Sequence, residues 1–261
     1  MRLVAWNTNH NGRRRSLEEN VRLLEPLGAD ILVLSEVARP RPDNPSGAHW
    51  CGDGAPGLSV VAPTGLSLTP FPENAGAPPL AAAYRVTGRI AFDLLAVWPV
   101  HIRGWRSYHK ILLAMLDRFA PLFGSDQLVL AGDLNTNTRV SRQQRSHPLF
   151  VEKLTSLGMV SAYHELTGEH HGRESVATYR HGNRKGSRFH IDYCFVPRSL
   201  LGDTKLEIRN SEEWSSRSDH DPLVLDIPDH ALRSLCGPPE QVGSASTPLR
   251  RDAGSMGNPS T

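Results

Sequence analysis

Cysteine and lysine are both scarce in this 261-residue chain. The three cysteines lie far apart without a CxxC pair, which argues against a disulfide framework or a cysteine zinc site and favours a reducing compartment. Arginine supplies most of the positive charge, because lysine occupies few positions: Lys110, Lys153, Lys185 and Lys205. Arginine suits bidentate phosphate contacts, although a bias in genomic base composition explains its excess equally well.

Long apolar runs are also missing. No apolar segment reaches the roughly 20 residues that cross a bilayer, so we expect no membrane span. At the N-terminus, Met1-Arg2 leads directly into a strand-like run, without the charged and apolar regions of a secretory signal peptide. Together with the cysteine usage, this pattern predicts a cytoplasmic protein.

A strong net charge is absent as well. The 29 Lys and Arg residues nearly balance the 27 Asp and Glu residues, for a formal net charge of +2. Such a balance neither demands nor excludes a nucleic-acid partner, and no feature of the chain points to a protein partner. The length suffices for one large α/β domain with a substantial core.

Apolar periodicity is lost near the C-terminal end. From Asp229 onward, Ser, Pro, Gly and Thr dominate together with scattered charge. Such a segment buries too little apolar surface to offset its loss of conformational entropy. We therefore predict one folded domain over 1–232 and a disordered tail over 233–261.

The chain does contain a regular opening of strand, helix and strand. Residues 2–6 and 31–34 are apolar runs. Between them, Ser16 and Glu19 form a capping-box pattern at the start of an amphipathic helix that Gly28 closes. This order places Asn7 and Glu36 at like ends of neighbouring strands.

The remaining pattern predicts further strands and two further helices. We expect a surface loop over 38–56, a run of antiparallel strands over 58–62, 81–86 and 91–98, and helices over 107–119 and 148–157. Later strands are expected over 127–131, 189–196, 204–209 and 222–227. The order fits a two-sheet sandwich with helices outside.

Acidic, amide and histidine residues lie where several of these apolar runs end. Asp133 and Asn135 follow 127–131, Asp192 lies in a strand-like run, and Asp219-His220 precedes 222–227. Side chains at the ends of buried strands can converge on one mouth of a sandwich. Hard oxygen ligands favour Mg²⁺ or Mn²⁺, and an Asp beside a His can tune a general base. Together these residues predict metal-assisted phosphoester hydrolysis.

The motifs and their order resemble the endonuclease/exonuclease/phosphatase superfamily, which includes pancreatic deoxyribonuclease, apurinic endonucleases, inositol polyphosphate phosphatases and sphingomyelinases. The resemblance covers about 2–228 and rests on Trp6-Asn7, Glu36, His101, Gly132-Asp133-Leu134-Asn135, Ile191-Asp192-Tyr193 and Ser218-Asp219-His220. It implies a four-layer α/β sandwich, in which two mixed β-sheets pack face to face with helices outside. It also implies an active site at one end of the two sheets and a divalent metal, Mg²⁺ or Mn²⁺.

The resemblance implies a role for each polar residue near the metal and the phosphate. Glu36 resembles the main metal ligand, and Asp219 a second acidic group at the metal. Asn7 resembles a polar group near the metal or phosphate. Asp133 and Asn135 resemble the pair that positions the nucleophile and stabilises charge on the phosphoryl oxygens.

Proton transfer is implied for a second set of residues. His220 resembles the catalytic histidine, Asp192 the carboxylate that orients it, and His101 a histidine that contacts the scissile phosphate. A water molecule needs orientation and proton removal, and a carboxylate on the other ring nitrogen favours the imidazolium. The residues alone leave open which group acts as the base. They also leave open whether Asp133, His101 or water on the metal protonates the leaving oxygen.

Several positions depart from the family pattern. Ser35 precedes Glu36 where a glutamine is common, and Asn9 stands where apurinic endonucleases carry an aspartate. The segment Trp98-Pro99-Val100-His101 replaces their tyrosine-proline-asparagine-glycine element, and the inositol phosphatase signature is absent. These departures weaken the readings as a DNA-repair enzyme and as an inositol phosphatase.

Four residues are candidates for contact with substrate: Asn9, Arg103, Arg139 and Tyr179. Arg139 lies in a loop that either grips phosphate or is simply solvated. Arg103 and its aromatic neighbours either grip phosphate and stack on a base or sugar, or pack in the core. Tyr179 contacts substrate or has a structural role. By contrast, we interpret His170-His171 as a surface loop rather than a metal site.

We favour a nuclease that cleaves phosphodiester bonds by in-line attack of an activated water. One alternative is a phosphatase or diesterase of a small phosphorylated metabolite or lipid headgroup. Another is a binding module that keeps the fold without the chemistry. The expected partner is a nucleic acid or another phosphoester substrate.

Overall fold

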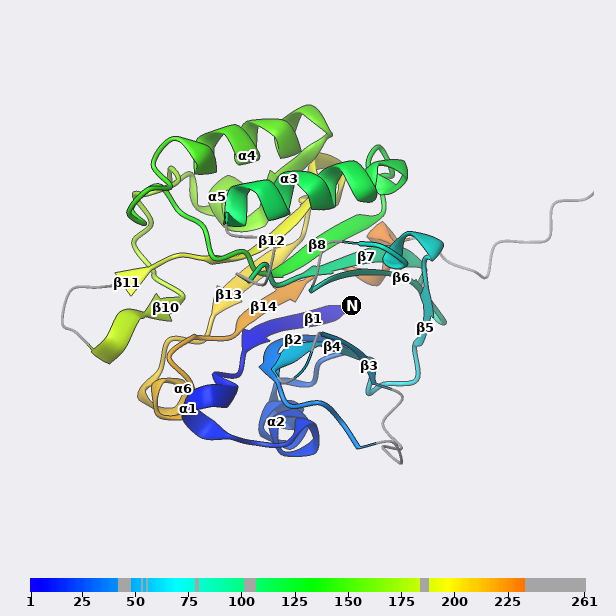
Figure 1. Ribbon diagram of the computed structural model, residues 1–261. Coiled ribbons are helices and arrows are strands. Elements are labelled where there is room, and N and C mark those ends of the chain that lie inside the picture. The colour runs from blue at the N-terminus through cyan, green and yellow to red at the C-terminus, as the bar shows by residue number, and fades with distance from the viewer. Residues whose placement is uncertain are drawn as a thin grey trace, which may run out of the picture.

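Two β-sheets pack face to face, and helices cover both outer faces (Figure 1). The computed structural model describes residues 1–41, 48–52, 54, 56–77, 80–100, 107–183 and 188–232. One apolar cluster fills the space between the sheets. Each sheet also has one apolar cluster between its outer face and the helices that cover it. The predicted four-layer α/β sandwich is therefore confirmed.

The first sheet has six strands in the order β13-β14-β1-β2-β4-β3. Their bounds are β1 (Arg2–Asn7), β2 (Ile31–Val37), β3 (His49–Cys51), β4 (Gly57–Val61), β13 (Lys205–Ile208) and β14 (Leu223–Asp226). The central pair β1 and β2 is parallel, with Asn7 opposite Ser35, and the other pairs are antiparallel. The predicted placement of Asn7 and Glu36 at like ends of neighbouring strands is confirmed.

The second sheet repeats this plan in the order β5-β6-β7-β8-β12-β9. Its strands are β5 (Ser67–Pro70), β6 (Ala81–Thr87), β7 (Phe92–Val97), β8 (Leu128–Asp133), β9 (Met159–Ser161) and β12 (Asp192–Pro197). Here β7 and β8 form the parallel pair, and β12 runs antiparallel to β8 with Asp192 opposite Asp133. A separate two-stranded ribbon joins β10 (Tyr179–Arg180) to β11 (Arg188–Phe189).

The helices form the two outer layers (Figure 1). Their bounds are α1 (His10–Arg13), α2 (Leu17–Leu24), α3 (Tyr108–Arg118), α4 (Ser146–Ser156), α5 (Ala162–Thr167) and α6 (Glu212–Arg217). The capping box at the start of α2 is present: Ser16 Oγ accepts from the Glu19 amide at 3.2 Å, and Glu19 Oε2 accepts from the Ser16 amide at 2.7 Å. A 3₁₀ turn extends α2 to Leu27, and Gly28 ends it with a φ of 60°.

Several short elements differ from the sequence prediction. The expected loop over 38–56 contains the half-buried strand β3, and the expected antiparallel run is split, because β4 joins the first sheet while β6 and β7 join the second. The elements β5, β9, α5 and α6 were not predicted. Each is six residues or shorter, which is too short for apolar periodicity to identify it.

The expected strand over 189–196 is divided into β11 and β12, so Asp192 begins a strand. The predicted tail over 233–261 lies outside the described residues, and the boundary at 232 stays a prediction. Within the described ranges, the helices are all too short or too polar to cross a membrane.

Candidate active site

Asn7 and Glu36 lie at the ends of the two parallel strands of the first sheet. The pairing of β2 with β4 shifts register between Leu34 and Val37, and Glu36 within this irregularity has a φ of 53°. Positive φ is uncommon for a residue with a side chain and is found at turns and functional sites. Asn7 Nδ2 lies 3.2 Å from Glu36 Oε1. The amide and the carboxylate therefore meet at this edge.

The end of β8 brings Asp133 and Asn135 to the same place from the second sheet. Asn7 Nδ2 also donates to Asp133 Oδ2 at 2.9 Å, so Asn7 bridges the two sheets. Asp133 in turn accepts from the Asn135 amide at 2.9 Å and from its side chain at 3.2 Å. A side chain is excluded at Gly132, because a Cβ there would lie 2.0 Å from the Val97 carbonyl oxygen.

His220 and Asp192 form a buried pair beside Asp133. His220 Nδ1 lies 2.9 Å from Asp192 Oδ2. Because an ionised carboxylate only accepts hydrogen bonds, Nδ1 carries the proton and Nε2 is left for proton exchange. Thr178 Oγ1 donates to the same carboxylate oxygen at 2.6 Å. Asp192 is therefore held by both His220 and Thr178.

Hydrogen bonds through Ser218 and Trp6 hold His220 against β1. Ser218 Oγ donates to the Asn7 carbonyl at 2.8 Å and accepts from the His220 amide at 3.1 Å. Trp6 Nε1 donates to the His220 carbonyl at 3.1 Å. The histidine backbone is thus tied to the strand that carries Asn7.

The charges of this cluster act strongly on one another. Single donor atoms of Asp133, Asp192 and His220 lie within 4.8 Å of one another. Burial disfavours the charged imidazole, but the nearby carboxylates, Asp192 first, outweigh it and raise the pKa of His220 to about 10. Burial and the Asp192 charge raise the pKa of Asp133 to about 7. Burial also raises the pKa of Glu36, against the Asn7 hydrogen bond that lowers it.

The cluster has more acidic charge than its neighbours balance. Among the described residues, no lysine or arginine forms an ion pair with Glu36, Asp133 or Asp219. The Asp219 charge is one of those that raise the pKa of Glu36. Carboxylate oxygens are the donors that Mg²⁺ and Mn²⁺ prefer. The residues present therefore fit a divalent cation beside Glu36 and Asp219.

Tyr179 lies beside this cluster. Its ring centroid is 4.5 Å from that of His220, and its hydroxyl lies 2.9 Å from His181 Nδ1. Tyr179 also lines a cavity of about 380 Å³ together with Asn135 and Tyr108. The aromatic ring of Tyr179 therefore packs directly beside the His220 imidazole.

The other candidates for substrate contact are placed differently. Arg139 is exposed and lines a separate cavity of about 410 Å³ with Arg180 and Arg188. Asn9 Oδ1 accepts from the Gly12 amide at 3.0 Å and so caps α1. His101 and Arg103 lie outside the described residues.

Sequence reasoning missed residues that position the site. Ser218 was named only as part of the Ser218-Asp219-His220 motif, and Thr178, next to Tyr179, was given no role of its own at the site. A hydroxyl next to a buried charge was the only available signal. Tyr108 is one of the aromatic neighbours of Arg103 that were expected either to stack on substrate or to pack in the core; burial first, and then the charges of Asp133 and Glu36, raise its pKa.

Comparison with known proteins rests on structure alone, because no family model and no curated protein sequence matches the chain. The 3′ phosphatase NExo from Neisseria, solved with a product DNA hairpin, shares 19% identity and a TM-score of 0.63 over 87% of this chain and 99% of its own. An AP endonuclease from Archaeoglobus fulgidus shares 16% identity and a TM-score of 0.62 over 87% and 99%. An endonuclease/exonuclease/phosphatase family protein from Leptotrichia buccalis shares 14% identity and a TM-score of 0.58 over the same shares.

The two sheets and their helices form a four-layer α/β sandwich. A polar cluster at one end of the sheets, which we call the acidic mouth, consists of Glu36, Asp133, Asp192, Asp219 and His220. The chain has the fold of the endonuclease/exonuclease/phosphatase superfamily, as its motifs indicated.

Proposed function

We propose that this chain is a divalent-metal-dependent phosphoesterase of the endonuclease/exonuclease/phosphatase superfamily, and specifically a nuclease that cleaves phosphodiester bonds. The observation that carries the proposal is the buried His220–Asp192 pair beside the acid and amide groups of Glu36, Asn7 and Asp133. The structural neighbours NExo and the Archaeoglobus AP endonuclease, which carry nucleic-acid activities in their names, favour nucleic acid as substrate.

His220 removes the proton from the attacking water. Asp192 holds Nδ1 at 2.9 Å and stabilises the imidazolium that forms, which leaves Nε2 to accept the proton. Thr178 donates to the same oxygen of the Asp192 carboxylate and so helps to fix its position. Tyr179 stacks beside the ring and limits where a substrate phosphate can lie.

The amides and Asp133 act on the phosphate. Asn135 Nδ2 lies 3.2 Å from both Asp133 Oδ2 and the Pro99 carbonyl, so it donates to a phosphoryl oxygen by giving up one of these contacts, without adding charge. Asp133 has its pKa raised to about 7 by burial and by the Asp192 charge, so it holds a proton near neutral pH that can pass to the leaving oxygen. Asn7 joins Asp133 to Glu36 and keeps the two sheets in register at the site.

Glu36 and Asp219 would hold Mg²⁺ or Mn²⁺, which when bound neutralises charge on the phosphoryl oxygens. Asn7 positions Glu36 instead of ligating, because its Nδ2 donates to both carboxylates and its Oδ1 accepts from the Asn9 amide at 3.0 Å.

The test is hydrolysis of DNA, RNA, bis-p-nitrophenyl phosphate and p-nitrophenyl phosphate with Mg²⁺ or Mn²⁺. Cleavage of nucleic acid, with the diester preferred over the monoester, supports the nuclease. Preference for the monoester would contradict the nuclease proposal and support the phosphatase alternative. If the folded protein turns over none of these substrates, the result supports the non-catalytic binding module instead. His220→Ala, measured in parallel, separates true turnover from a contaminating hydrolase.

A further inference from the structure

A second group of titratable side chains lies away from the proposed active site, between α4, α5 and the start of β12. Its members are four imidazoles and one carboxylate: His147, His164, His171, His190 and Glu174. His147 comes from α4 and His164 from α5, while His171 and Glu174 come from the segment after α5. None of them belongs to the proposed active site.

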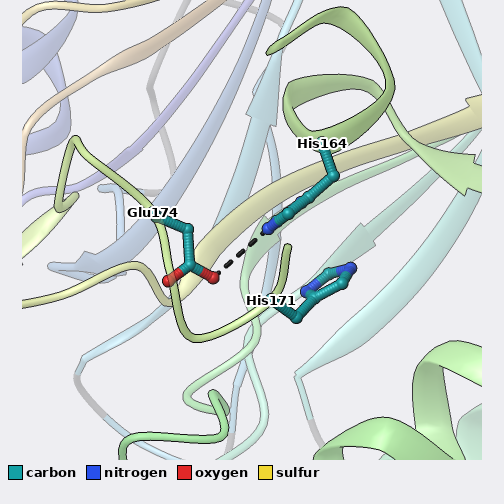
Figure 2. Close-up of side chains that lie close together, drawn as sticks. All are labelled: His164, His171 and Glu174. Atoms are coloured by element: carbon teal, nitrogen blue, oxygen red, sulfur yellow. Dashed lines mark hydrogen bonds and ion pairs between the residues drawn. The ribbon is translucent and has the colours of Figure 1, made fainter. Parts of the chain in front are cut away.

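The contacts within this histidine cluster are short and converge. His164 Nε2 lies 3.2 Å from Glu174 Oε1, and His147 Nε2 lies 3.0 Å from His171 Nδ1. The rings of His164 and His171 stack with centroids 3.5 Å apart. Figure 2 shows His164 directed from its helix toward the Glu174 carboxylate, with His171 beside them. The segment is a loop, as expected, and His170 is exposed, but the half-buried His171 ring packs against His164.

These separations match a metal coordination shell. Tetrahedral Zn²⁺ with bonds of about 2.0–2.1 Å holds neighbouring ligand atoms about 3.3 Å apart. Single donor atoms of His164, His171 and Glu174 all lie within 4.8 Å of one another. We propose that His164, His171 and Glu174 bind a Zn²⁺ ion, and that His147 supports His171 through the contact between their ring nitrogens.

Surrounding hydrogen bonds hold the ligand His164 and its supporting neighbour His147. His164 Nδ1 lies 2.8 Å from Ser161 Oγ, and His147 Nδ1 lies 3.2 Å from Thr136 Oγ1. A ligating histidine nearly always anchors its second ring nitrogen in this way, which fixes the tautomer and ring orientation. The other nitrogen of each ring is the one directed into the cluster.

His190 adds an independent observation beside the cluster. Its ring is buried, and its centroid lies 5.5 Å from that of His164. Nδ1 lies 3.1 Å from the Val176 carbonyl, so Nδ1 carries the proton and Nε2 the lone pair. Within the described residues, this buried Nε2 has no hydrogen-bond partner. An unpaired buried imidazole nitrogen is costly, and a cation in the cluster would reduce that cost.

The chemistry of the donors selects the metal. The site offers two imidazole nitrogens, from His164 and His171, and one carboxylate, from Glu174. Neutral nitrogens with one carboxylate suit Zn²⁺, whereas Mg²⁺ prefers oxygen ligands. The histidine cluster and the acidic mouth thus suit different metals.

The role of the ion is structural. Glu174 Oε1 also accepts from Asn137 Nδ2 at 2.9 Å, and Asn137 Nδ2 lies 2.9 Å from the His190 carbonyl. Asn137 follows Asn135 by two residues. A Zn²⁺ ion in the cluster would therefore fix the segment around Glu174 against α4, α5 and the chain that leaves β8.

The experiment is metal binding by the full chain after removal of metal with a chelator. We expect one Zn²⁺ per chain in competition with a chromophoric chelator, undiminished by excess Mg²⁺, together with a higher Tm. Co²⁺ in the same site should give the intense visible bands of tetrahedral nitrogen ligation. His171→Ala should weaken Zn²⁺ binding by at least about 100-fold, since even residues that only support a ligand affect affinity by 10–100-fold.

His170→Ala is the matched control, because His170 is exposed, adjacent in sequence and outside the cluster. It should bind Zn²⁺ within about twofold of the unchanged chain. Glu174→Gln keeps the size of the side chain and covers the case in which His171→Ala does not fold. Glu36→Gln should keep this Zn²⁺, which separates it from any ion at the acidic mouth. Equal binding by His171→Ala and His170→Ala, or no Zn²⁺ on the unchanged chain, would overturn the proposal.

Discussion

His220 and His171 belong to two clusters that treat an imidazole in opposite ways. At the acidic mouth, carboxylates led by Asp192 raise the pKa of His220 to about 10 despite its burial. In the histidine cluster, burial and neighbouring imidazoles lower the pKa of His171 to about 2. The sign of the surrounding charge, more than the residue type or its burial, decides which histidine is charged.

The two clusters are also neighbours along the chain. His190 and Asp192 stand two residues apart, yet one packs near His164 and the other holds His220. After β8, Asn135 likewise donates to Asp133 at the acidic mouth, whereas Asn137 donates to Glu174 in the histidine cluster. The two clusters should therefore respond differently to substitution, to pH and to metal.

The largest effect is expected from the pair at the acidic mouth. His220→Ala should lower kcat by about 10²–10⁴-fold, the usual range for a positioned proton-transfer group. Asp192→Asn should also lower kcat, because it removes the carboxylate that fixes the tautomer. The two losses should not add in the double variant, since both residues serve one unit. If the logarithmic losses add in full, the two residues act independently; His170→Ala serves as the unaffected control.

The next effect concerns the metal at the mouth. Glu36→Gln keeps the shape of the side chain and removes one ligand charge, so at least about tenfold more Mg²⁺ should be needed for half-maximal rate. The Tm should change little, because a carboxylate at a strand end contributes little packing. The measurement is initial rate against Mg²⁺ concentration. Undiminished turnover at every concentration would remove Glu36 from the metal site.

The pH dependence of the rate should report the raised pKa of His220, in contrast to the lowered pKa values in the histidine cluster. A base must be neutral, and the pKa of His220 is raised to about 10 by Asp192 and the other carboxylates. Asp133 must also keep the proton that it gives to the leaving oxygen, and its pKa is raised to about 7, so the rate should rise with pH up to about 7, stay level up to about 10 and fall above it. Asp192→Asn removes the charge that raises the pKa of His220 most. The limb of the profile that reports His220 should therefore move to lower pH, while the maximum rate falls. The profile of log kcat/KM against pH measures both, and an unmoved limb would contradict the assignment.

Acid should destabilise the histidine cluster selectively. His147 has a folded pKa lowered by burial to about 4 from an ordinary 6.5. Its contribution is present above pH 6.5 and is lost as the pH falls toward 4, at about 1.4 kcal/mol per pH unit and group at most. His220, with a raised pKa, contributes below pH 6.5 and loses its contribution only as the pH rises toward 10. His147→Gln should therefore flatten the fall of Tm between pH 7 and 4.5, measured without metal, and His220→Gln should not.

The smallest effect is expected from the C-terminal end. The described residues of both clusters all precede 232, so a chain that ends at Leu232 should keep both. Its Tm should lie within a few degrees of that of the full chain, and its Zn²⁺ stoichiometry should be unchanged. Differential scanning calorimetry checks the first statement. A large drop in Tm would show that the segment after 232 packs on the domain.

Much of the fold was predictable from local pattern. The strands β1, β2 and β8 and the helices α2 and α3 all show apolar spacing long enough to identify, and Ser16 and Glu19 mark one helix start. Short elements such as β3 and α5 carry no such signal, because their contacts come from distant parts of the chain. At the site, Asn7, Asp133, Asp192 and His220 were predicted to converge, and the structure places them together.

By itself, the sequence determined where apolar runs end and which polar residues stand there, because side-chain period and capping are local properties. Only the tertiary structure decided that Thr178 reaches Asp192 and that His147, His164 and Glu174 gather near His171. These contacts depend on which strands pair and how a loop folds back on its helices. Such choices follow from burial of the whole core, and no spacing along the chain encodes them.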